Sequence, residues 1–302
     1  MPILLLAPIA AFAGAVVLVI AIVSGVSRPP TASAAARAAL RHGQLITALA
    51  WIMLTLGLAV GLVLGRTVGL SPTGAVSAVL VVAGLLYVAV HAVGELNFPR
   101  PQGAIRRASL VPRSVADVAP RWLRTATWAW LGLAVAIAVA GALTSSDGRS
   151  ITRSTGTAGP YPGPDYALPA LVAIAVLVLA AEGALRLVAR RPAVMDADPE
   201  WDLALRRLGA HRALRGGQLT AGLTVAALLF YGGIALHSVG LGGLSGGVIA
   251  LAALVAGTAA VLAFVPAAAP TTEPGFAPGA TGAGVASLSG ATPKRHGPDF
   301  SG

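Results

Sequence analysis

The chain has 302 residues, of which 56% are hydrophobic and only 11% are charged, and it contains no cysteine. Soluble domains carry about 25% charged residues, so this composition indicates a membrane protein. The absence of cysteine excludes a disulfide framework, a thiolate nucleophile and a cysteine metal site.

The formal net charge of +10 is also typical of nucleic-acid-binding proteins. The arginines, however, cluster in loops between long apolar segments, where they meet lipid headgroups and set orientation. We therefore expect the partners to be the lipid bilayer, with anionic lipid headgroups at the cytoplasmic loops, and no nucleic acid.

Seven apolar segments are each close to the roughly 20 residues that cross a hydrocarbon core of about 30 Å. The sequence predicts membrane-spanning helices over residues 3–26, 44–65, 74–93, 122–144, 167–189, 218–239 and 246–265. The first segment has no basic residue before it, which favours a retained span over a signal peptide. The predicted fold class is an all-α polytopic bundle of seven transmembrane helices over residues 1–266. A disordered cytoplasmic tail is predicted over residues 267–302.

The loop over residues 95–124 sets the predicted orientation, because it holds six arginines and only two acidic residues. With this loop in the cytoplasm, alternating loops place 18 basic residues inside. Only Arg66, Arg149 and Arg153 fall outside, which accounts for all 21. The sequence therefore predicts a plasma-membrane protein with its N-terminus outside and its C-terminus in the cytoplasm.

Three loops carry local signals. The outer loop over residues 145–164 is rich in Gly, Ser, Thr and Pro, which predicts turns without strands. Ser114 and Asp117 match a capping box and predict a short surface helix before the fourth span. The arginine-rich run over residues 203–215 predicts a helix lying on the inner surface, which Asp198 is placed to cap.

Three short matches in the same order suggest an internal repeat. The matched pairs are residues 39–45 with 213–219, 24–28 with 182–186, and 82–84 with 255–257. They align the first three spans with the last three in a parallel 3+1+3 plan, as in SWEET-type transporters. The alternative is a chance alignment of segments rich in Ala, Leu and Gly.

Four ionisable residues near the inner ends of two spans are the candidate site residues. Glu182 lies about fifteen residues, roughly 22 Å, from the outer end of its span, and Arg186 follows at i+4. His91 and Glu95 have the same spacing in the third span. We expect Glu182 to face the bundle interior and to meet Arg186, His91 or Arg215. The favoured interpretation is that each pair only anchors its helix end. The alternative is a cluster that relays protons or holds a polar solute.

Gly57, Gly61 and Gly65 form a tandem small-xxx-small face in the second span. We expect this face to pack against a neighbouring helix of the same chain. A membrane protein partner or a homo-oligomer is the alternative.

Enzyme signatures are missing from the sequence. It contains no zinc-protease, P-loop or nucleophile-elbow motif. Its only lysine, Lys294, lies in the predicted tail, which excludes a retinal protein. We expect no catalytic residue, no cofactor and no metal site, and we do not expect an enzyme.

Residues 94–101 read Gly-Glu-Leu-Asn-Phe-Pro-Arg-Pro, and Gly103, Arg106 and Arg107 follow. This segment resembles one in uncharacterised multi-pass membrane proteins of actinobacteria that share the Gly-Glu-Leu-x-x-Pro-Arg-Pro pattern. The resemblance covers the third span and the loop after it. It implies an integral plasma-membrane protein and brings no activity or site residue with it.

The leading functional hypothesis is a non-enzymatic component or accessory of the plasma membrane. The alternative is a transporter of small solutes or hydrophobic substrates with the 3+1+3 plan. A carrier of polar solutes needs several polar groups near the middle of the bilayer, and the sequence places few there.

Overall fold

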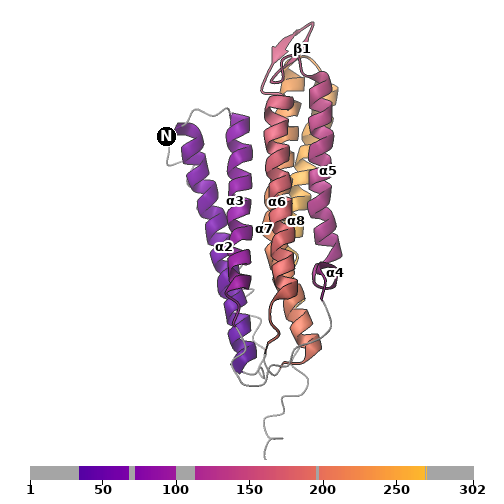
Figure 1. Ribbon diagram of the computed structural model, residues 1–302. Helices are drawn as coiled ribbons and strands as arrows, with labels where there is room; N and C mark the ends of the chain where they lie inside the picture. Colours follow the sequence, from indigo (N-terminus) through magenta and orange to yellow (C-terminus); the bar gives the residue numbers. More distant parts are fainter. Residues whose placement is uncertain (1–33, 68–71, 100–112, 195–196, 269, 271–302) are drawn as a thin grey trace, which may run out of the picture.

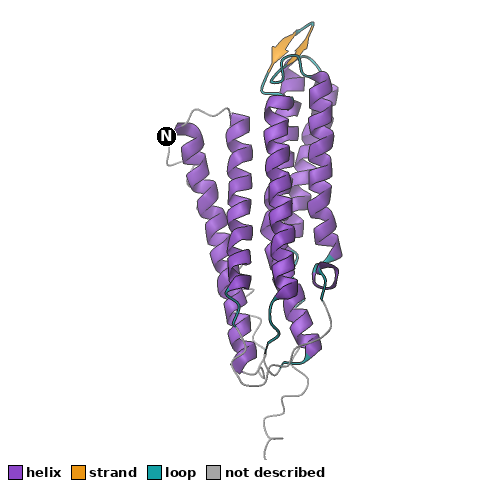
Figure 2. Cartoon of the chain, viewed as in Figure 1, coloured by secondary structure: helices purple, strands orange, loops and turns teal. Residues whose placement is uncertain are grey.

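The structure is a computed structural model that describes residues 34–67, 72–99, 113–194, 197–268 and 270. Within these ranges the chain is a helical bundle with one small β-hairpin (Figures 1 and 2). The elements are α2 (Ala34–Thr67), α3 (Pro72–Leu96), α4 (Val115–Val118), α5 (Arg121–Thr144), β1 (Ile151–Arg153), β2 (Gly156–Ala158), α6 (Pro164–Arg190), α7 (Pro199–Ser238) and α8 (Gly242–Phe264). The predicted all-α fold class is confirmed.

All the described helices except the short α4 are long and apolar enough to cross a membrane, which makes the chain a multi-pass membrane protein. They correspond to six of the seven predicted spans. The first predicted span, over residues 3–26, lies outside the described residues, as does nearly all of the tail predicted over residues 267–302.

The six long helices alternate in direction, so the bundle has two distinct ends (Figure 1). At the end that carries α4, helices α2, α5 and α7 begin and helices α3, α6 and α8 finish. The hairpin lies at the opposite end, between α5 and α6. We call these the α4 end and the hairpin end.

Helix α7 is the central element, because it packs against α2, α3, α4, α5, α6 and α8. The prediction of a separate surface helix over residues 203–215 is wrong. These residues form the first part of α7, and many of them are buried. The predicted cap is confirmed, since the Asp198 carboxylate accepts hydrogen bonds from the amides of Glu200 (2.9 Å) and Trp201 (3.2 Å).

Glycines let the neighbouring helices approach α7 closely. A Cβ atom on Gly216 would lie 2.6 Å from the ring of Tyr87, which is completely buried. The Tyr87 hydroxyl donates a 2.6 Å hydrogen bond to the backbone oxygen of Arg212, one turn earlier on α7. Gly222 similarly meets Ala259 of α8. Small residues at such contacts are the usual means of close helix packing in membranes.

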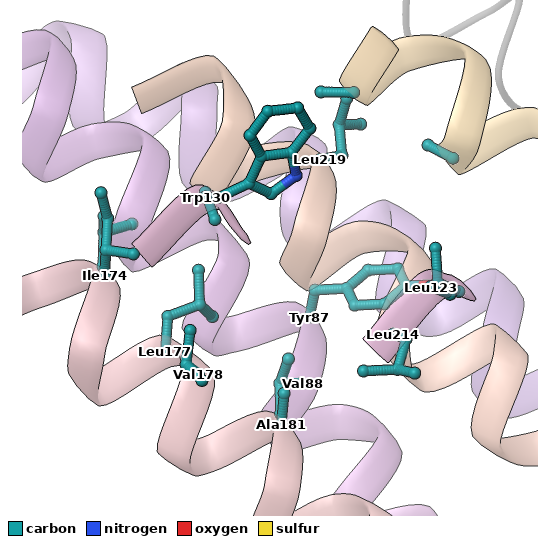
Figure 3. Close-up of a cluster of buried hydrophobic side chains, with 14 of the residues drawn as sticks. Tyr87, Val88, Leu123, Trp130, Ile174, Leu177, Val178, Ala181, Leu214 and Leu219 are labelled. Carbon is teal, nitrogen blue, oxygen red and sulfur yellow. The ribbon is translucent and has the colours of Figure 1, made fainter. Parts of the chain in front are cut away.

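The hydrophobic core fills the space between α3, α5, α6 and α7 (Figure 3). Its large side chains include Tyr87, Leu123, Ile174, Leu177 and Leu214, each at most 2% exposed. The expected packing of the second span is confirmed for two of its three glycines. Gly57 lies against Ala83 and Gly61 against Val79, both on α3 of the same chain.

The outer surface of the bundle is apolar. Leu143 is 81% exposed, Leu45 70% and Leu254 66%, on three different helices. A surface of this kind is unfavourable in water and is typical of helices that face lipid. The expected bilayer environment follows from this surface together with the helix lengths.

The expectation of turns without strands at the hairpin end is wrong. Strands β1 and β2 pair antiparallel, with Ile151 opposite Ala158 and Arg153 opposite Gly156. Each strand has three residues, which is too short for a visible alternation of apolar and polar residues. The turn is anchored to α7, because the Thr155 hydroxyl donates a 2.6 Å hydrogen bond to the Val239 oxygen.

The matched residues of the predicted repeat lie in different environments. Val82 is 52% exposed, whereas its match Val255 is 5% exposed. Gly84 packs against Thr220 and Leu177, whereas nothing lies within 4 Å of a Cβ atom on its match, Gly257. Equivalent positions of a symmetric repeat would share their surroundings more closely. The superposition of the two halves stays a prediction, since the first span lies outside the described residues.

Gly216→Ala tests the central position of α7. The added methyl group overlaps the Tyr87 ring, and overpacking of this kind typically costs about 1–3 kcal/mol. We therefore expect thermal unfolding in detergent micelles at a lower temperature than for the natural chain. Gly257→Ala is the matched control and should be neutral or slightly stabilising, because alanine is the better helix former. A Gly216→Ala protein as stable as the control would mean that Tyr87 does not pack on α7.

Candidate functional site

The four residues predicted to form one polar cluster are divided between two sites. Glu182 meets helix α5, whereas His91 and Glu95 line a pocket between α2, α3 and α7. Arg186 is exposed and makes no hydrogen bond to Glu182. The expected meeting of the two pairs is therefore not found.

Glu182 is buried and forms a bidentate ion pair with Arg124 in the first turn of α5. Arg124 Nε donates to Glu182 Oε1 at 2.7 Å, and Arg124 Nη2 donates to Oε2 at 3.1 Å. Trp128 Nε1 adds a third hydrogen bond to Oε1 at 3.1 Å. This parallel geometry is the strong form of the arginine–carboxylate contact. The partners of Glu182 are thus Arg124 and Trp128 of α5, and not the expected Arg186, His91 or Arg215.

The second site is a pocket at the α4 end, which we call the α2–α3–α7 pocket. Its lining residues are Ala39, His42, Gly43, Ile46 and Thr47 of α2, His91, Gly94 and Glu95 of α3, Phe98, Arg191, and Leu205, Gly209 and Arg212 of α7. The space open to the centre of a water molecule is about 20 Å³, enough for one or two waters. The pocket has no room for a sugar or a larger solute.

Two of the four candidate site residues predicted from the sequence, His91 and Glu95, line this pocket. His91 is 5% exposed, and its Nε2 atom has no hydrogen-bond partner. Its ring lies 4.9 Å from the Tyr87 ring. One helical turn further on, Glu95 Oε2 lies 3.6 Å from Arg191 Nη1, which is an ion pair too long for a hydrogen bond.

Two arginines that sequence analysis did not single out complete the pocket. The Arg191 side chain is only 3% exposed, and its guanidinium lies 4.3 Å from the centre of the Phe98 ring. Burial lowers the pKa of Arg191, and the neighbouring Glu95 offsets only part of this effect. The guanidinium nevertheless stays charged, as arginines do in proteins. Arg212 lies against α2, with Nη1 3.0 Å from where a Cβ atom on Gly43 would be.

A third polar group ties α6 to the start of α7. Asp202 is 1% exposed and forms ion pairs with Arg113 and with Arg206, whose Nε lies 2.9 Å away. Arg206 Nη1 also donates to the backbone oxygens of Val188 and Ala189, each at 3.0 Å. These bonds satisfy carbonyl groups that the end of α6 leaves free. Their role is therefore to join two helices.

Gln218, halfway along α7, is completely buried in the bundle interior, with 0% exposure. Its Oε1 atom accepts a 3.2 Å hydrogen bond from Trp130 Nε1, and its Nε2 atom donates a 2.9 Å bond to the Ala259 oxygen. One side chain thus links α5, α7 and α8.

The sequence contained a signal for only some of these residues. Asp202 and Arg206 stand at i and i+4, the spacing of a helical ion pair. Gln218 appeared only as one end of a repeat match, and Arg191 and Arg212 only as charges in an inner loop. Nothing in their spacing indicates which helices they join.

The chemistry available to these sites is charge pairing and anion binding. Among the described residues no group of three or more His, Asp or Glu side chains is placed to hold a metal ion. The α2–α3–α7 pocket combines two guanidinium groups, two imidazoles and one carboxylate in a small space.

Comparison of the chain with protein-family models, with curated proteins and with solved structures finds no match. The resemblance of residues 94–101 to proteins of actinobacteria therefore stays a prediction.

Glu182→Gln tests the ion pair between α5 and α6. Glutamine keeps the acceptor for Trp128 but loses the charge that holds Arg124, which is partly exposed and can turn to the surface. Polar contacts between membrane helices average about 0.6 kcal/mol and reach about 1.7, so we expect a loss of stability in this range. Unfolding of the purified protein in micelles measures it. Arg186→Gln, one turn further along α6, should have no effect, and an equal loss there would make Arg186 the true partner.

Proposed function

We propose that the chain is a non-enzymatic component of the plasma membrane, with its N-terminus outside and its C-terminus in the cytoplasm. The observation that carries the orientation is the division of arginines between the two ends. The described arginines at the α4 end are Arg37, Arg41, Arg113, Arg121, Arg124, Arg186, Arg190, Arg191, Arg206, Arg207, Arg212 and Arg215. The hairpin end has Arg66, Arg149 and Arg153. By the positive-inside rule, the α4 end faces the cytoplasm.

The non-enzymatic role is supported by how the polar side chains inside the bundle are used. Gln218 and Glu182 form their hydrogen bonds with neighbouring helices, and Asp202 accepts from Arg206 of its own helix and from Arg113 of the chain before α4. A catalytic site needs groups that converge on an open space where a substrate can lie. These three side chains hold helices together instead, which favours a structural component.

The transporter hypothesis has less support. A carrier of polar solutes needs polar groups that line a path near the middle of the bilayer. Among the described residues, Gln218 at the midpoint of α7 has both its amide oxygen and its amide nitrogen hydrogen-bonded to neighbouring helices. Glu182 is paired with Arg124. The α2–α3–α7 pocket lies at one end of the bundle and admits only one or two waters.

Single cysteines test the orientation directly, because the natural chain has none. Arg153→Cys places a thiol on the exposed hairpin, and Glu200→Cys places one at the exposed start of α7. A membrane-impermeant maleimide should label Arg153→Cys in intact cells. It should label Glu200→Cys only after the cells are permeabilised. The reverse result would invert the proposed orientation, and labelling of both in intact cells would contradict the helix layout.

A further inference from the structure

The α2–α3–α7 pocket contains more positive than negative charge. Arg191 and Arg212 each contribute one positive charge, and Glu95 contributes the only carboxylate among the lining residues. The other buried carboxylate nearby, Asp202, is already shared by Arg113 and Arg206. The pocket is thus left with one positive charge that no described residue balances. Arg191 is buried and Arg212 is partly buried, and a charge that is removed from water without a partner is unfavourable, so a counter-ion is expected there.

The donors of this pocket are also unused. Arg191 Nε and Nη2 are buried without a hydrogen-bond acceptor, and Arg191 Nη1 reaches Glu95 only at 3.6 Å. The Arg212 guanidinium has no acceptor among the described residues, although it is held against α2 beside Gly43. His91 Nε2 is a further buried atom without a partner. Arginine forks of this kind match the oxygens of a phosphate group.

We propose that the α2–α3–α7 pocket binds a phosphate group, with Arg191 and Arg212 as its two charged donors. The enclosed space holds one or two waters, so one or two oxygens of a phosphate group enter it and the rest of the molecule stays outside. The balance of one positive charge matches a phosphodiester, which carries one negative charge. The pocket lies at the α4 end, where the arginine-rich helix ends are expected to meet lipid headgroups.

Two sources supply this chemistry: the headgroup of an anionic lipid, and free inorganic phosphate. The assignment of the headgroup to the cytoplasmic leaflet rests on the proposed orientation. The binding chemistry does not, so cysteine labelling and phosphate binding fail independently of each other.

The experiment uses the full chain in micelles of a maltoside detergent, which contains no phosphate. Thermal unfolding is followed during titration with short-chain phosphatidylglycerol, with inorganic phosphate, and with the matching diacylglycerol, which lacks the phosphate. Chloride keeps the ionic strength constant. We expect the unfolding temperature to rise and saturate with phosphatidylglycerol and to stay unchanged with the diacylglycerol.

Variants then assign the effect to the pocket. Arg212→Gln and Arg191→Gln should each weaken binding roughly tenfold to a hundredfold, because each removes a charged hydrogen-bond donor. Arg190→Gln is the matched control, since Arg190 is exposed and adjacent to Arg191, and it should bind like the natural chain. Arg212→Lys keeps the charge but loses the fork and should lie between the two.

Each result decides the proposal. Saturable stabilisation by phosphatidylglycerol alone identifies a lipid headgroup, and the same effect with inorganic phosphate identifies a free anion as a sufficient ligand. Either one supports the proposal when it depends on Arg191 and Arg212. The proposal is overturned if the natural chain shows no saturable rise with either probe. It is equally overturned if Arg190→Gln loses as much binding as the two pocket variants.

Discussion

A helix that crosses a bilayer keeps a buried polar side chain only where other groups of the protein satisfy its hydrogen bonds, and this constraint is strongest on α7. Gln218 stands at the midpoint of that helix with no exposed surface. Its amide oxygen is bound to Trp130 of α5, and its amide nitrogen to Ala259 of α8. Gly216 of α7 admits the Tyr87 ring of α3, and Gly222 admits Ala259 of α8. The positions of α3, α5 and α8 therefore depend on how α7 is packed.

The α4 end differs, because buried ion pairs lie there beside the apolar contacts of Phe98, Trp201 and Leu205. Glu182 joins α6 to α5, and Asp202 joins the start of α7 to the chain before α4. Breaking such a pair is more harmful than never having built it, since the remaining charge is left buried. In the α2–α3–α7 pocket the charges of the described lining residues fail to cancel. That imbalance separates a candidate binding site from contacts that only hold helices together.

Much of the fold was predictable from the sequence, because long apolar runs and capping residues are local signals. Six spans and the capping box at Ser114 were expected from such signals and are present. The partner of Glu182 was not predictable, because Arg124 is 58 residues away and the i+4 rule considers only the same helix. The burial of the arginine-rich start of α7 was missed for a similar reason. Arg206 is tolerated there because Asp202 and two carbonyl groups of α6 receive its donors.

The most direct test of the central role of α7 is the free energy of unfolding of Gln218→Leu compared with Gln44→Leu. Leucine at position 218 leaves Trp130 Nε1 without its hydrogen-bond partner and removes the bond to Ala259, so we expect a loss of about 1–3 kcal/mol. Gln44, its match in the predicted repeat, is partly exposed and has no hydrogen bond among the described residues, so its replacement should change the free energy little. Equal effects at the two positions, or no effect at Gln218, would contradict the account.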